Sequence, residues 1–530
     1  MSAIPTIANV AWSLANVPAY VQFTAAMDHP RAAQERLLRD YVRRNANTDF
    51  GRRHAFDTID SVASFRRHVP IRHYDAIAPQ VDRIVNGEPN VLTAEPVRRL
   101  ATSSGSTRAR KLIPYTRTLQ REFNRAIGPW LADLYRMNPS LAAGCAYWSI
   151  TPVASQPEPR RSPGAPPIGF EEDSAYLGGW RKRLVDAVMA VPGDVRHFQD
   201  IDAFRFATLR HLLRRRDLRL ISVWHPSFLE LLLDAAAARW GDLIADIAKD
   251  DGRRAAELHR IGPDAWGRVW PDLALISCWA DAHATGPAQG LRARLPDVEF
   301  QPKGLLATEA FVTIPFRGAW PVAIRSHFFE FLEEDGSLKL ADELLVGHRY
   351  GVVVTTGGGL WRYQLGDCVE VDQLVGRTPS LRFVGRSDHV VDRFGEKLNE
   401  EFVGRTIRAV VANSGVSATF SMLALDGTRY TLFIESPDPL PDALAATLDA
   451  AMRVNPQYDY CRRLGQLQAP AVFSIRGHAF KQYLSAMRRR GIRAGDAKPT
   501  PLSGLADWAS IFEGAYHAGR ADSPVPESRY

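Results

Sequence analysis

Hydrophobic and polar positions follow two different periods along this chain. Between Arg31 and Arg44, apolar residues return every three to four positions, which predicts a surface helix with one buried face. Three short apolar runs, at 146–150, 218–224 and 273–279, have the length of buried strands, and helical stretches lie between them. Because strands alternate with helices, the pattern predicts an α/β fold in which helices connect the strands.

The pattern changes after about Arg386. A helical stretch is followed there by two alternating runs that meet at Asp426-Gly427, which is typical of a β-hairpin turn. Further helices and one more strand complete a small α+β unit. We therefore predict a large N-terminal α/β domain with mixed sheets and flanking helices over residues 1–388, and a small C-terminal α+β domain over residues 389–530.

Composition limits the partners that we expect. The 530 residues carry 66 lysines and arginines against 59 acidic residues, and the net charge of +7 is spread along the chain, so we expect no nucleic-acid partner. No apolar stretch reaches the length of a membrane helix, so we expect no membrane partner. The first 27 residues are apolar but lack early basic residues, which predicts a packed helical arm rather than a signal peptide.

The cysteines lie far apart and form no cluster of metal ligands. Their spacing therefore predicts neither a disulfide framework nor a zinc site. Free cysteines favour a reducing compartment, so we expect a cytoplasmic protein, and we expect a monomer. The four cysteines are Cys145, Cys278, Cys368 and Cys461.

The segment from Thr102 to Lys111 reads TSSGSTRARK. Small hydroxyl residues around a glycine let backbone amides and hydroxyls approach phosphate oxygens, and the basic residues that follow add positive charge. Serine- and glycine-rich turns also occur in ordinary surface loops, so this segment alone leaves both interpretations open.

Three later segments favour nucleotide binding. Lys303–Glu309 ends an apolar run with a hydroxyl and a carboxylate, which are groups that can hold a phosphate and its Mg2+. Leu360–Asp367 places an acid after a glycine, where it can accept hydrogen bonds from both ribose hydroxyls. Phe383–Arg386 precedes the predicted domain boundary, and Glu396–Glu400 follows it. Each segment is a weak signal alone, but their order along the chain is specific.

Several residues at predicted strand ends have two interpretations. His225 follows an apolar strand, where α/β sites gather, and it either faces a substrate pocket or starts a helix beside Pro226. Trp148, Trp279 and Trp320 either line a pocket or belong to the core. The scattered histidines show no catalytic triad.

With these segments in view, the chain resembles the Gretchen Hagen family of acyl acid amido synthetases, the plant auxin-responsive group and its bacterial relatives, within the class of acyl-adenylate-forming enzymes. The resemblance runs nearly end to end. It includes segments on both sides of the serine-rich loop, namely Thr48–Arg52, Val69–Asp75, Asn86–Glu88, Trp224–Phe228 and Ala494–Pro499.

The resemblance implies a reaction in two steps. A carboxylic acid is activated with ATP and Mg2+ to an acyl-adenylate, and pyrophosphate leaves. An amine, commonly that of an amino acid, then attacks the adenylate and forms an amide. The implied partners are therefore a small carboxylic acid and an amine or amino acid, and the small domain is implied to be a mobile lid.

The same resemblance implies roles for individual residues. Asp367 would bind the ribose, and Glu309 would bind the magnesium ion. Lys397 and Lys498 would be catalytic lysines that the small domain brings to the phosphates. His225 is a weaker candidate for the substrate pocket. The other implied nucleotide-binding residues are Ser103, Ser104, Gly105, Ser106, Thr107, Thr308 and Arg386.

Some positions depart from the family pattern. Arg108 stands where a second glycine is usual, and Arg110 stands where proline is frequent. Leu305-Leu306 replaces an aromatic-glycine pair, and Trp361 replaces a tyrosine. Two alternatives stay open: a thioester-forming ligase, which would share the adenylation residues and accept a thiol, and a non-catalytic nucleotide-binding relative.

Overall fold

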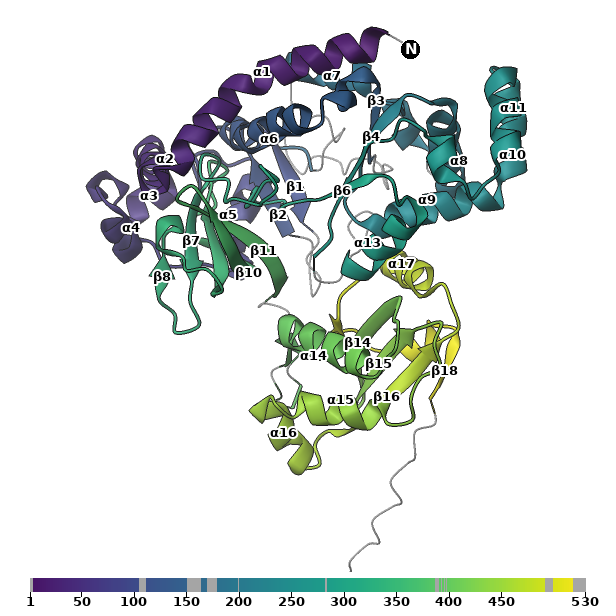
Figure 1. Ribbon diagram of the computed structural model, residues 1–530. Helices are drawn as coiled ribbons and strands as arrows, with labels where there is room; N and C mark the ends of the chain where they lie inside the picture. The colour runs from purple at the N-terminus through teal and green to yellow at the C-terminus, as the bar shows by residue number, and fades with distance from the viewer. Residues whose placement is uncertain are drawn as a thin grey trace, which may run out of the picture. The chain divides into compact units, whose positions relative to one another are not determined.

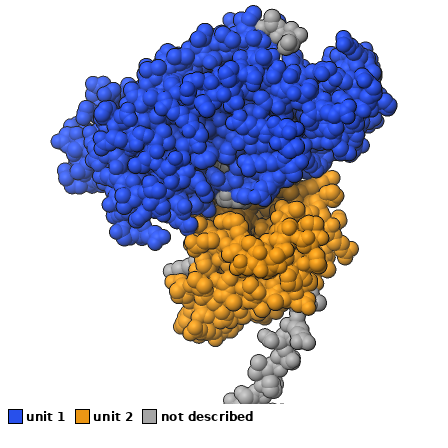
Figure 2. Space-filling view, in the orientation of Figure 1, with its two compact units in different colours: residues 1–384 blue, residues 385–530 orange. Residues whose placement is uncertain are grey.

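The computed structural model describes most of the chain, and its residues form two compact units, Met1–Val384 and Gly385–Tyr530 (Figure 2). The predicted fold class, a mixed α/β protein with a larger N-terminal and a smaller C-terminal part, is confirmed (Figure 1). The described residues are 3–103, 111–149, 164–168, 179–198, 200–281, 284–386, 390–391, 393–394, 396, 398–490 and 499–517.

The larger unit contains a four-stranded parallel sheet in the order β3-β4-β5-β6. Its strands are β3 (Cys145–Trp148), β4 (Leu218–Ser222), β5 (Leu275–Cys278) and β6 (Glu299–Pro302). The first three coincide with the three apolar runs that were predicted as buried strands. Because all four strands are parallel, their carboxyl ends lie at one edge, where ligands bind in open α/β sheets.

Helices connect the strands of this sheet, as the alternating pattern predicts. They are α7 (Gly179–Val188), α8 (Ile201–Arg214), α9 (Pro226–Ala238), α10 (Trp240–Ala248), α11 (Gly252–Ile261), α12 (Trp266–Val269) and α13 (Thr285–Arg294). Parallel neighbours need such crossover connections, because a short turn cannot return the chain to the starting edge.

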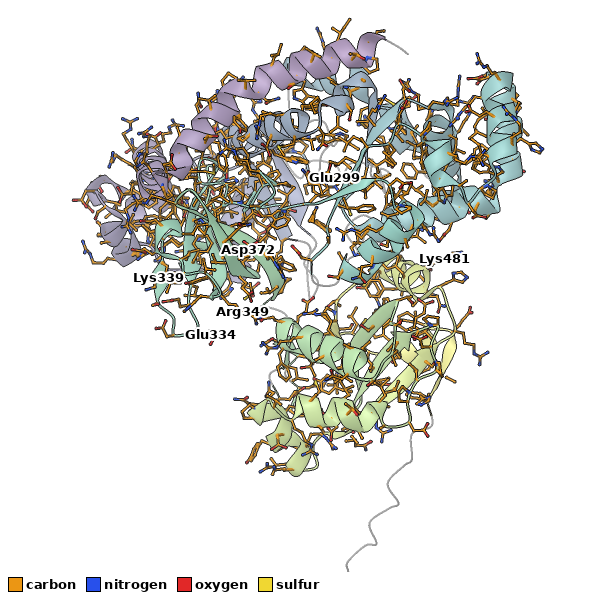
Figure 3. The ribbon with its side chains drawn as sticks, viewed as in Figure 1. Glu299, Glu334, Lys339, Arg349, Asp372 and Lys481 are labelled. Atoms are coloured by element: carbon orange, nitrogen blue, oxygen red, sulfur yellow. The ribbon has the colours of Figure 1, made fainter. Side chains whose placement is uncertain are left out.

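A second sheet of the larger unit has the order β11-β10-β9-β7-β8. Its strands are β7 (Phe328–Leu332), β8 (Leu338–Lys339), β9 (Arg349–Thr355), β10 (Tyr363–Val375) and β11 (Thr378–Arg386). Phe328 and Phe329 are both fully buried, so both faces of β7 are covered, because neighbouring side chains point to opposite faces. The edge strand β8 carries Lys339 (Figure 3). The Lys339 ammonium pairs with Glu333.

The helix predicted between Arg31 and Arg44 is α2 (Pro30–Asn45), and it packs on this second sheet. The Gln34 side chain accepts a hydrogen bond from the Phe329 amide at 2.7 Å and donates to the His327 carbonyl at 2.8 Å. A buried amide that is satisfied on both sides fixes the helix against β7.

The remaining elements of this unit surround the two sheets. They are α1 (Ala3–Met27), α3 (Asp49–Arg53), α4 (Val62–His68), α5 (Tyr74–Val85), α6 (Arg117–Met137), β1 (Arg99–Ser103) and β2 (Lys111–Tyr115). The predicted N-terminal helical arm is α1, which packs on α6, where Asn9 accepts a hydrogen bond from the Tyr135 hydroxyl at 2.7 Å. Within the described ranges, no helix combines the length and the apolar character that crossing a membrane requires.

The smaller unit contains a five-stranded sheet in the order β17-β14-β15-β16-β18. Side chains of α14 and α15 pack on one face of this sheet, and side chains of α17 pack on the other. The predicted hairpin at Asp426-Gly427 is confirmed, since Asp426 pairs with Arg429. Its elements are β12 (Val390–Val391), β13 (Leu398–Asn399), α14 (Glu400–Asn413), β14 (Phe420–Asp426), β15 (Arg429–Glu435), α15 (Leu444–Met452), α16 (Pro456–Arg463), β16 (Gln468–Ile475), α17 (Ala479–Arg489), β17 (Leu502–Ser503) and β18 (Gly514–Tyr516).

Candidate functional site

The serine- and glycine-rich segment joins the two strands of a β-hairpin. Strands β1 and β2 are antiparallel, and Ser103 at the end of β1 pairs with Lys111 at the start of β2. Ser103 therefore stands at the base of the hairpin loop. The other predicted phosphate residues, Ser104, Gly105, Ser106 and Thr107, lie outside the described residues, as do Lys397 and Lys498.

Thr308 and Glu309 form the tip of a tight turn. The Ala307 amide donates to the Ala310 carbonyl at 2.9 Å, and the residues on either side of this pair continue as an antiparallel bridge. Glu309 is only 6% exposed, and Thr308 is half-buried. The turn thus presents a hydroxyl and a carboxylate next to each other.

Gly304 lets the chain enter this turn. A Cβ atom at this position would lie 2.3 Å from the Thr313 carbonyl oxygen, which is closer than any side chain can come. The Leu305 amide next to it donates to the Thr313 hydroxyl at 2.7 Å. The glycine in the motif is therefore required by packing between the two arms of the turn.

A buried polar network holds the far arm of the turn. The Phe311 amide donates to Nε2 of His327 at 3.1 Å, so Nδ1 carries the imidazole proton and donates to Glu122 at 3.0 Å. Glu122 is fully buried and also accepts from the Tyr41 hydroxyl at 2.7 Å and the Gly357 amide at 3.0 Å. Burial, and then the Glu122 charge, raise the pKa of Tyr41 well above its ordinary value.

Asp367 lies in a β-bulge of strand β10. On β10, Gln364 pairs with Val353 and Cys368 pairs with Gly351, so three residues of β10 stand opposite one residue of β9. Gly366 inside the bulge has φ of +81°, a left-handed conformation that favours glycine. The bulge turns the strand at this point and places the Asp367 residue, which is 4% exposed, within the larger unit.

The segment Arg72–Tyr74 connects the start of β10 with the serine-rich hairpin. The Arg72 amide donates to the Arg362 carbonyl at 3.0 Å, and the Gln364 amide donates to the Arg72 carbonyl at 2.9 Å. Two residues further on, the Tyr74 hydroxyl accepts from the Leu112 amide of β2 at 2.7 Å. One short segment therefore lies between the start of β10 and the base of the serine-rich hairpin.

Glu309 also lies in the electrostatic environment of Tyr74. Burial raises the pKa of Tyr74, its hydrogen bond to Leu112 opposes that shift, and the negative charges of Asp82, Glu309 and Asp75 add to it. The segment Arg72–Tyr74 is thus bonded to the start of β10 through Arg72 and to the hairpin through Tyr74, and the negative charge of Glu309 acts on Tyr74. The sequence placed Tyr74 in a family segment but gave no sign of its hydrogen bond to Leu112.

Arg72 is held in place by an aromatic and an imidazole side chain. Its guanidinium carbon lies 4.7 Å from the centre of the Phe50 ring, and Nη2 contacts Nε2 of His54 at 3.1 Å. Nδ1 of His54 donates to the His68 carbonyl at 2.6 Å, so Nε2 is the acceptor. Burial lowers the pKa of His54, which keeps the ring neutral beside the arginine.

Two residues of the Leu360–Asp367 motif stabilise the fold. Arg362 is 3% exposed, lies at φ of +46°, and donates to Glu330 at 2.7 Å and to the Val69 carbonyl at 2.6 Å. The Trp361 indole donates to the Leu92 carbonyl at 2.9 Å inside the core. The tryptophan that departs from the family pattern therefore has a packing role here.

His225 and Arg386 lie at the ends of secondary-structure elements. His225 is the N-cap of α9, buried next to Pro226, and its Nδ1 accepts a hydrogen bond from the Ser227 amide at 3.4 Å. This is the helix-start interpretation, and a role in a substrate pocket stays a prediction. Arg386 is the last residue of β11 and is half-buried.

The donor set fits a nucleotide with a metal ion better than a metal ion held by protein alone. In the part of the chain that the structure describes, no three His, Cys, Asp or Glu side chains gather as metal ligands. One carboxylate and one hydroxyl, as at Glu309 and Thr308, match the way in which Mg2+ is bound, through one or two protein oxygens together with phosphate oxygens.

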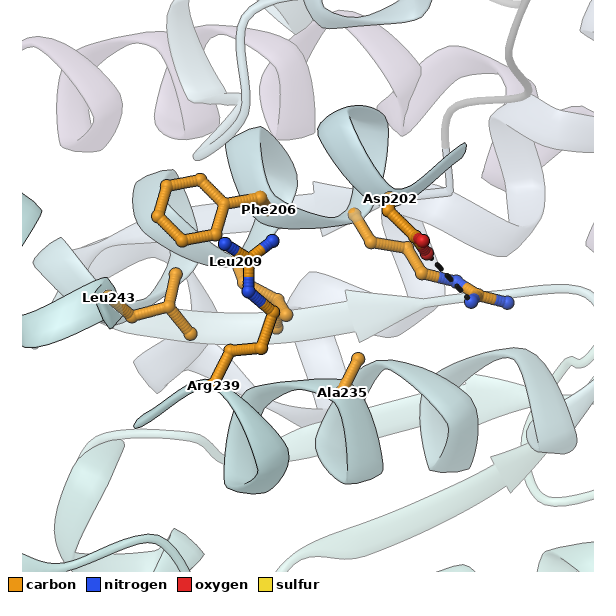
Figure 4. A pocket seen from close by; sticks show the side chains of 7 residues that line it. Asp202, Phe206, Leu209, Ala235, Arg239 and Leu243 are labelled. Carbon is orange, nitrogen blue, oxygen red and sulfur yellow. Dashed lines mark ion pairs between the residues drawn. The ribbon is translucent and has the colours of Figure 1, made fainter. Parts of the chain in front are cut away.

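A crevice between α8 and α9 contains none of the predicted residues (Figure 4). Its volume of about 30 Å³ holds about one water molecule. The Arg239 guanidinium lies over the Phe206 ring at 4.5 Å within it. This crevice is therefore an ordinary packing gap between helices.

Three domains of one protein family match the chain along most of its length. The descriptions that match are the GH3 family N-terminal domain over residues 19–298, the GH3 family central domain over 320–386 and the GH3 family C-terminal domain over 403–504. The chain belongs to the GH3 family, and the resemblance to the Gretchen Hagen family that the sequence suggested is thereby confirmed.

Individual relatives have low sequence identity to this chain, but the matches cover more than two thirds of both proteins. The indole-3-acetic acid-amido synthetase GH3.4 of Arabidopsis thaliana is 23% identical over 468 residues, which are 77% of this chain and 74% of that protein. The indole-3-acetic acid-amido synthetase GH3.8 of Oryza sativa subsp. indica is 24% identical over 438 residues, which are 72% of this chain and 70% of that protein.

The fold is shared with a solved member of the same family. The structure of the GH3.15 acyl acid amido synthetase covers 93% of this chain and 95% of its own, with a TM-score of 0.79 at 18% identity. The same synthetase in complex with 2,4-DB gives a TM-score of 0.80 at 17% identity, covering 94% of this chain and 97% of its own. These relatives are named as amido synthetases, which agrees with the reaction class predicted from the sequence.

Proposed function

We propose that this protein is a ligase that activates a carboxylic acid with ATP to an acyl-adenylate and then transfers the acyl group to an amine, commonly that of an amino acid. The observation that carries this proposal is the segment Arg72–Tyr74, whose hydrogen bonds join the start of the strand that bears Asp367 to the serine-rich hairpin, while the charge of Glu309 acts on Tyr74. The names of the family relatives support the same reaction.

Each motif has a task that follows from its chemistry. The amides and hydroxyls of Ser103–Thr107 bind phosphate oxygens, and Asp367 accepts hydrogen bonds from the ribose hydroxyls. Thr308 and Glu309 hold a phosphate and a magnesium ion, and the ion supplies positive charge that offsets the repulsion between phosphate and carboxylate. Arg386 adds a charged contact to ribose or phosphate.

The small C-terminal domain, predicted over residues 389–530, performs the second part of the mechanism. The smaller domain acts as a lid that carries Lys397 and Lys498, and these lysines stabilise the negative charge that develops on the α-phosphate during adenylation. Amide formation needs a neutral amine and an activated acyl group, and it therefore depends much less on these lysines.

The test is carboxylate-dependent exchange between pyrophosphate and ATP. Incubation of the protein with ATP, Mg2+, labelled pyrophosphate and a panel of carboxylic acids should give labelled ATP with at least one acid. Hydroxylamine and coenzyme A, offered as competing acceptors, then separate an amide-forming from a thioester-forming enzyme. Absence of exchange with every acid, while ATP still raises the melting temperature, would leave the non-catalytic nucleotide-binding alternative.

A further inference from the structure

The outer face of helix α1 carries a stripe of apolar residues. This helix lies along the outside of the larger unit (Figure 1). Six of its large apolar residues are each between 45% and 67% exposed, although residues of these types are mostly buried in folded proteins. The smaller residues Ala11, Pro18 and Ala25 are exposed on the same helix. We call these nine residues the outer stripe, and its six large members are Ile4, Ile7, Val10, Leu14, Val17 and Val21.

The outer stripe follows a seven-residue repeat. Apolar residues return along it at alternating intervals of three and four positions, which is the a and d pattern of a heptad. This is the spacing along which one helix packs lengthwise against another, because it keeps the apolar side chains on one line of the helix. The pattern therefore indicates a second helix as the occupant of this face. The a positions are Ile4, Ala11, Pro18 and Ala25, and the d positions are Ile7, Leu14 and Val21.

The inner face of α1 is fixed on the larger unit. Trp12 is buried, and its ring stacks on the Trp148 ring at a centre-to-centre distance of 5.8 Å. The Asn9 side chain donates to the Gly144 carbonyl at 2.8 Å and accepts from the Tyr135 hydroxyl at 2.7 Å. Rotation of the helix would break these buried contacts and expose a tryptophan. A single copy of the chain therefore keeps the outer stripe at its surface.

The candidate site gives no reason for this stripe. None of the motifs that would bind the nucleotide, the magnesium ion or the acid lies on α1. The match to the GH3 family N-terminal domain begins at residue 19, and five of the six large apolar residues precede it. Contiguous exposed apolar surface on a soluble protein marks a place where another surface binds. The outer stripe is therefore an interaction surface that is separate from the site.

The absence of charge on α1 favours a second copy of this chain over a membrane. The 25 residues of the helix include no Asp, Glu, Lys, Arg or His. Helices that bind at a membrane surface are rich in Lys and Arg, which attract anionic lipid headgroups, and α1 offers none. A twofold dimer brings the same patch of both copies together. An uncharged apolar patch can meet its own copy without repulsion between like charges.

The length of α1 sets the size of such a contact. Its 25 residues span about 38 Å at a rise of 1.5 Å per residue. If each helix, about 10–12 Å across, buries a third of its circumference over this length, two copies remove roughly 800–950 Å² of surface from water. Stable complexes usually bury about 1,200 Å² or more, and smaller interfaces belong to weak associations. The expected dimer therefore has a dissociation constant of about micromolar size.

We propose that this protein forms a twofold homodimer in which the α1 helices of two copies pack against each other along the outer stripe. Leu14 lies near the middle of this contact, and the dimer covers its side chain. The inference goes beyond the proposed function and does not depend on it. It differs from the monomer that the sequence suggested, and the oligomeric state in solution decides between the two.

Sedimentation velocity of the full-length protein tests this inference. As the protein concentration rises from about 1 µM to about 100 µM, the wild-type protein should shift from its monomer mass of 59.0 kDa towards twice that mass. Burial of apolar surface drives the association, so the shift should not weaken when the salt concentration rises from about 0.05 M to about 0.5 M. An association between charged surfaces would weaken over the same range.

The variant is Leu14→Glu, and the matched control is Leu345→Glu, because the two leucines are 65% and 57% exposed. Leu14→Glu places a carboxylate of each copy in the contact, so its dissociation constant should rise at least tenfold. Leu345→Glu should associate as wild type. Both variants should keep the wild-type melting temperature, since a substitution at an exposed position changes stability little. Ile7→Glu, at a position that is 67% exposed, is a second variant of the outer stripe and should behave as Leu14→Glu does.

Three results would overturn the inference. The first is a wild-type protein that stays monomeric up to about 100 µM. The second is a dimer that survives in both Leu14→Glu and Ile7→Glu. The third is a monomer that floats with vesicles of phosphatidylcholine and phosphatidylglycerol and loses this binding in Leu14→Glu, which would assign the outer stripe to a membrane. None of these results bears on the adenylation reaction, which pyrophosphate exchange tests separately.

Discussion

The network around Glu122 gives the prediction that depends most directly on the geometry. Glu122→Ala removes the acceptor of three donors that are buried in the larger unit. Tyr41 keeps a partner, because its hydroxyl also lies 3.3 Å from the Ser326 carbonyl. The imidazole N–H of His327 and the Gly357 amide have no second acceptor in the described contacts. At about 1–3 kcal/mol for each unsatisfied buried donor, the variant should lose about 4 kcal/mol of stability.

The measurement is urea denaturation followed by tryptophan fluorescence, read at the transition of the larger unit. Glu299→Ala, which removes an exposed carboxylate at the start of β6, is the control and should unfold as wild type (Figure 3). Because His327 also holds the arm of the Thr308–Glu309 turn, ATP affinity should fall in Glu122→Ala under conditions where it is still folded. A free energy of unfolding within about 0.5 kcal/mol of the wild-type value would refute the hydrogen-bond assignment, since a change of that size is ordinary for a surface substitution.

Three further changes test separate parts of the structure. Asp367→Ala should weaken ATP binding by about 1–3 kcal/mol in calorimetry, since it loses charged hydrogen bonds to the ribose, and an unchanged affinity would exclude that role. Gly304→Ala should destabilise the chain by about 1–3 kcal/mol in thermal unfolding, because its Cβ meets the Thr313 carbonyl at 2.3 Å. Burial raises the pKa of Glu230 to about 7, so the folded protein holds a proton there that the unfolded chain releases above about pH 4.5. The folded state consequently loses stability as the pH rises from about 4.5 through 7. In thermal unfolding, Glu230→Gln should melt at a higher temperature than wild type at pH 8 but not at pH 4.5.

Local patterns in the sequence were sufficient to predict the main helices and strands of the fold. The strands at β3, β4 and β5 are short apolar runs, and the hairpin at Asp426-Gly427 has a turn that only few sequences favour. In these cases the periodicity or the turn chemistry is contained within a few neighbouring residues. The same holds for the helix α2, whose buried stripe is readable from its spacing alone.

Contacts between distant segments could not be read in this way. Glu122 and His327 are separated by 205 positions, and nothing in either neighbourhood indicates that one satisfies the other. Lys303 was visible only as the first residue of a motif, because its ammonium donates to the Ser222 and Ser277 hydroxyls on two other strands. Sequence motifs identified which residues carry chemistry, whereas the pairing that decides their charge and orientation depends on the whole fold.

Lys498 is the residue at which the proposed mechanism is tested most directly. The decisive measurement compares Lys498→Ala with wild type in both half-reactions, using an acid that supports pyrophosphate exchange. The account predicts a loss of about a hundredfold or more in pyrophosphate exchange, because the variant lacks the preorganised positive charge that stabilises the α-phosphate. It predicts a much smaller loss in amide formation from chemically prepared acyl-adenylate. An equal loss in both half-reactions, or no loss in either, would contradict it.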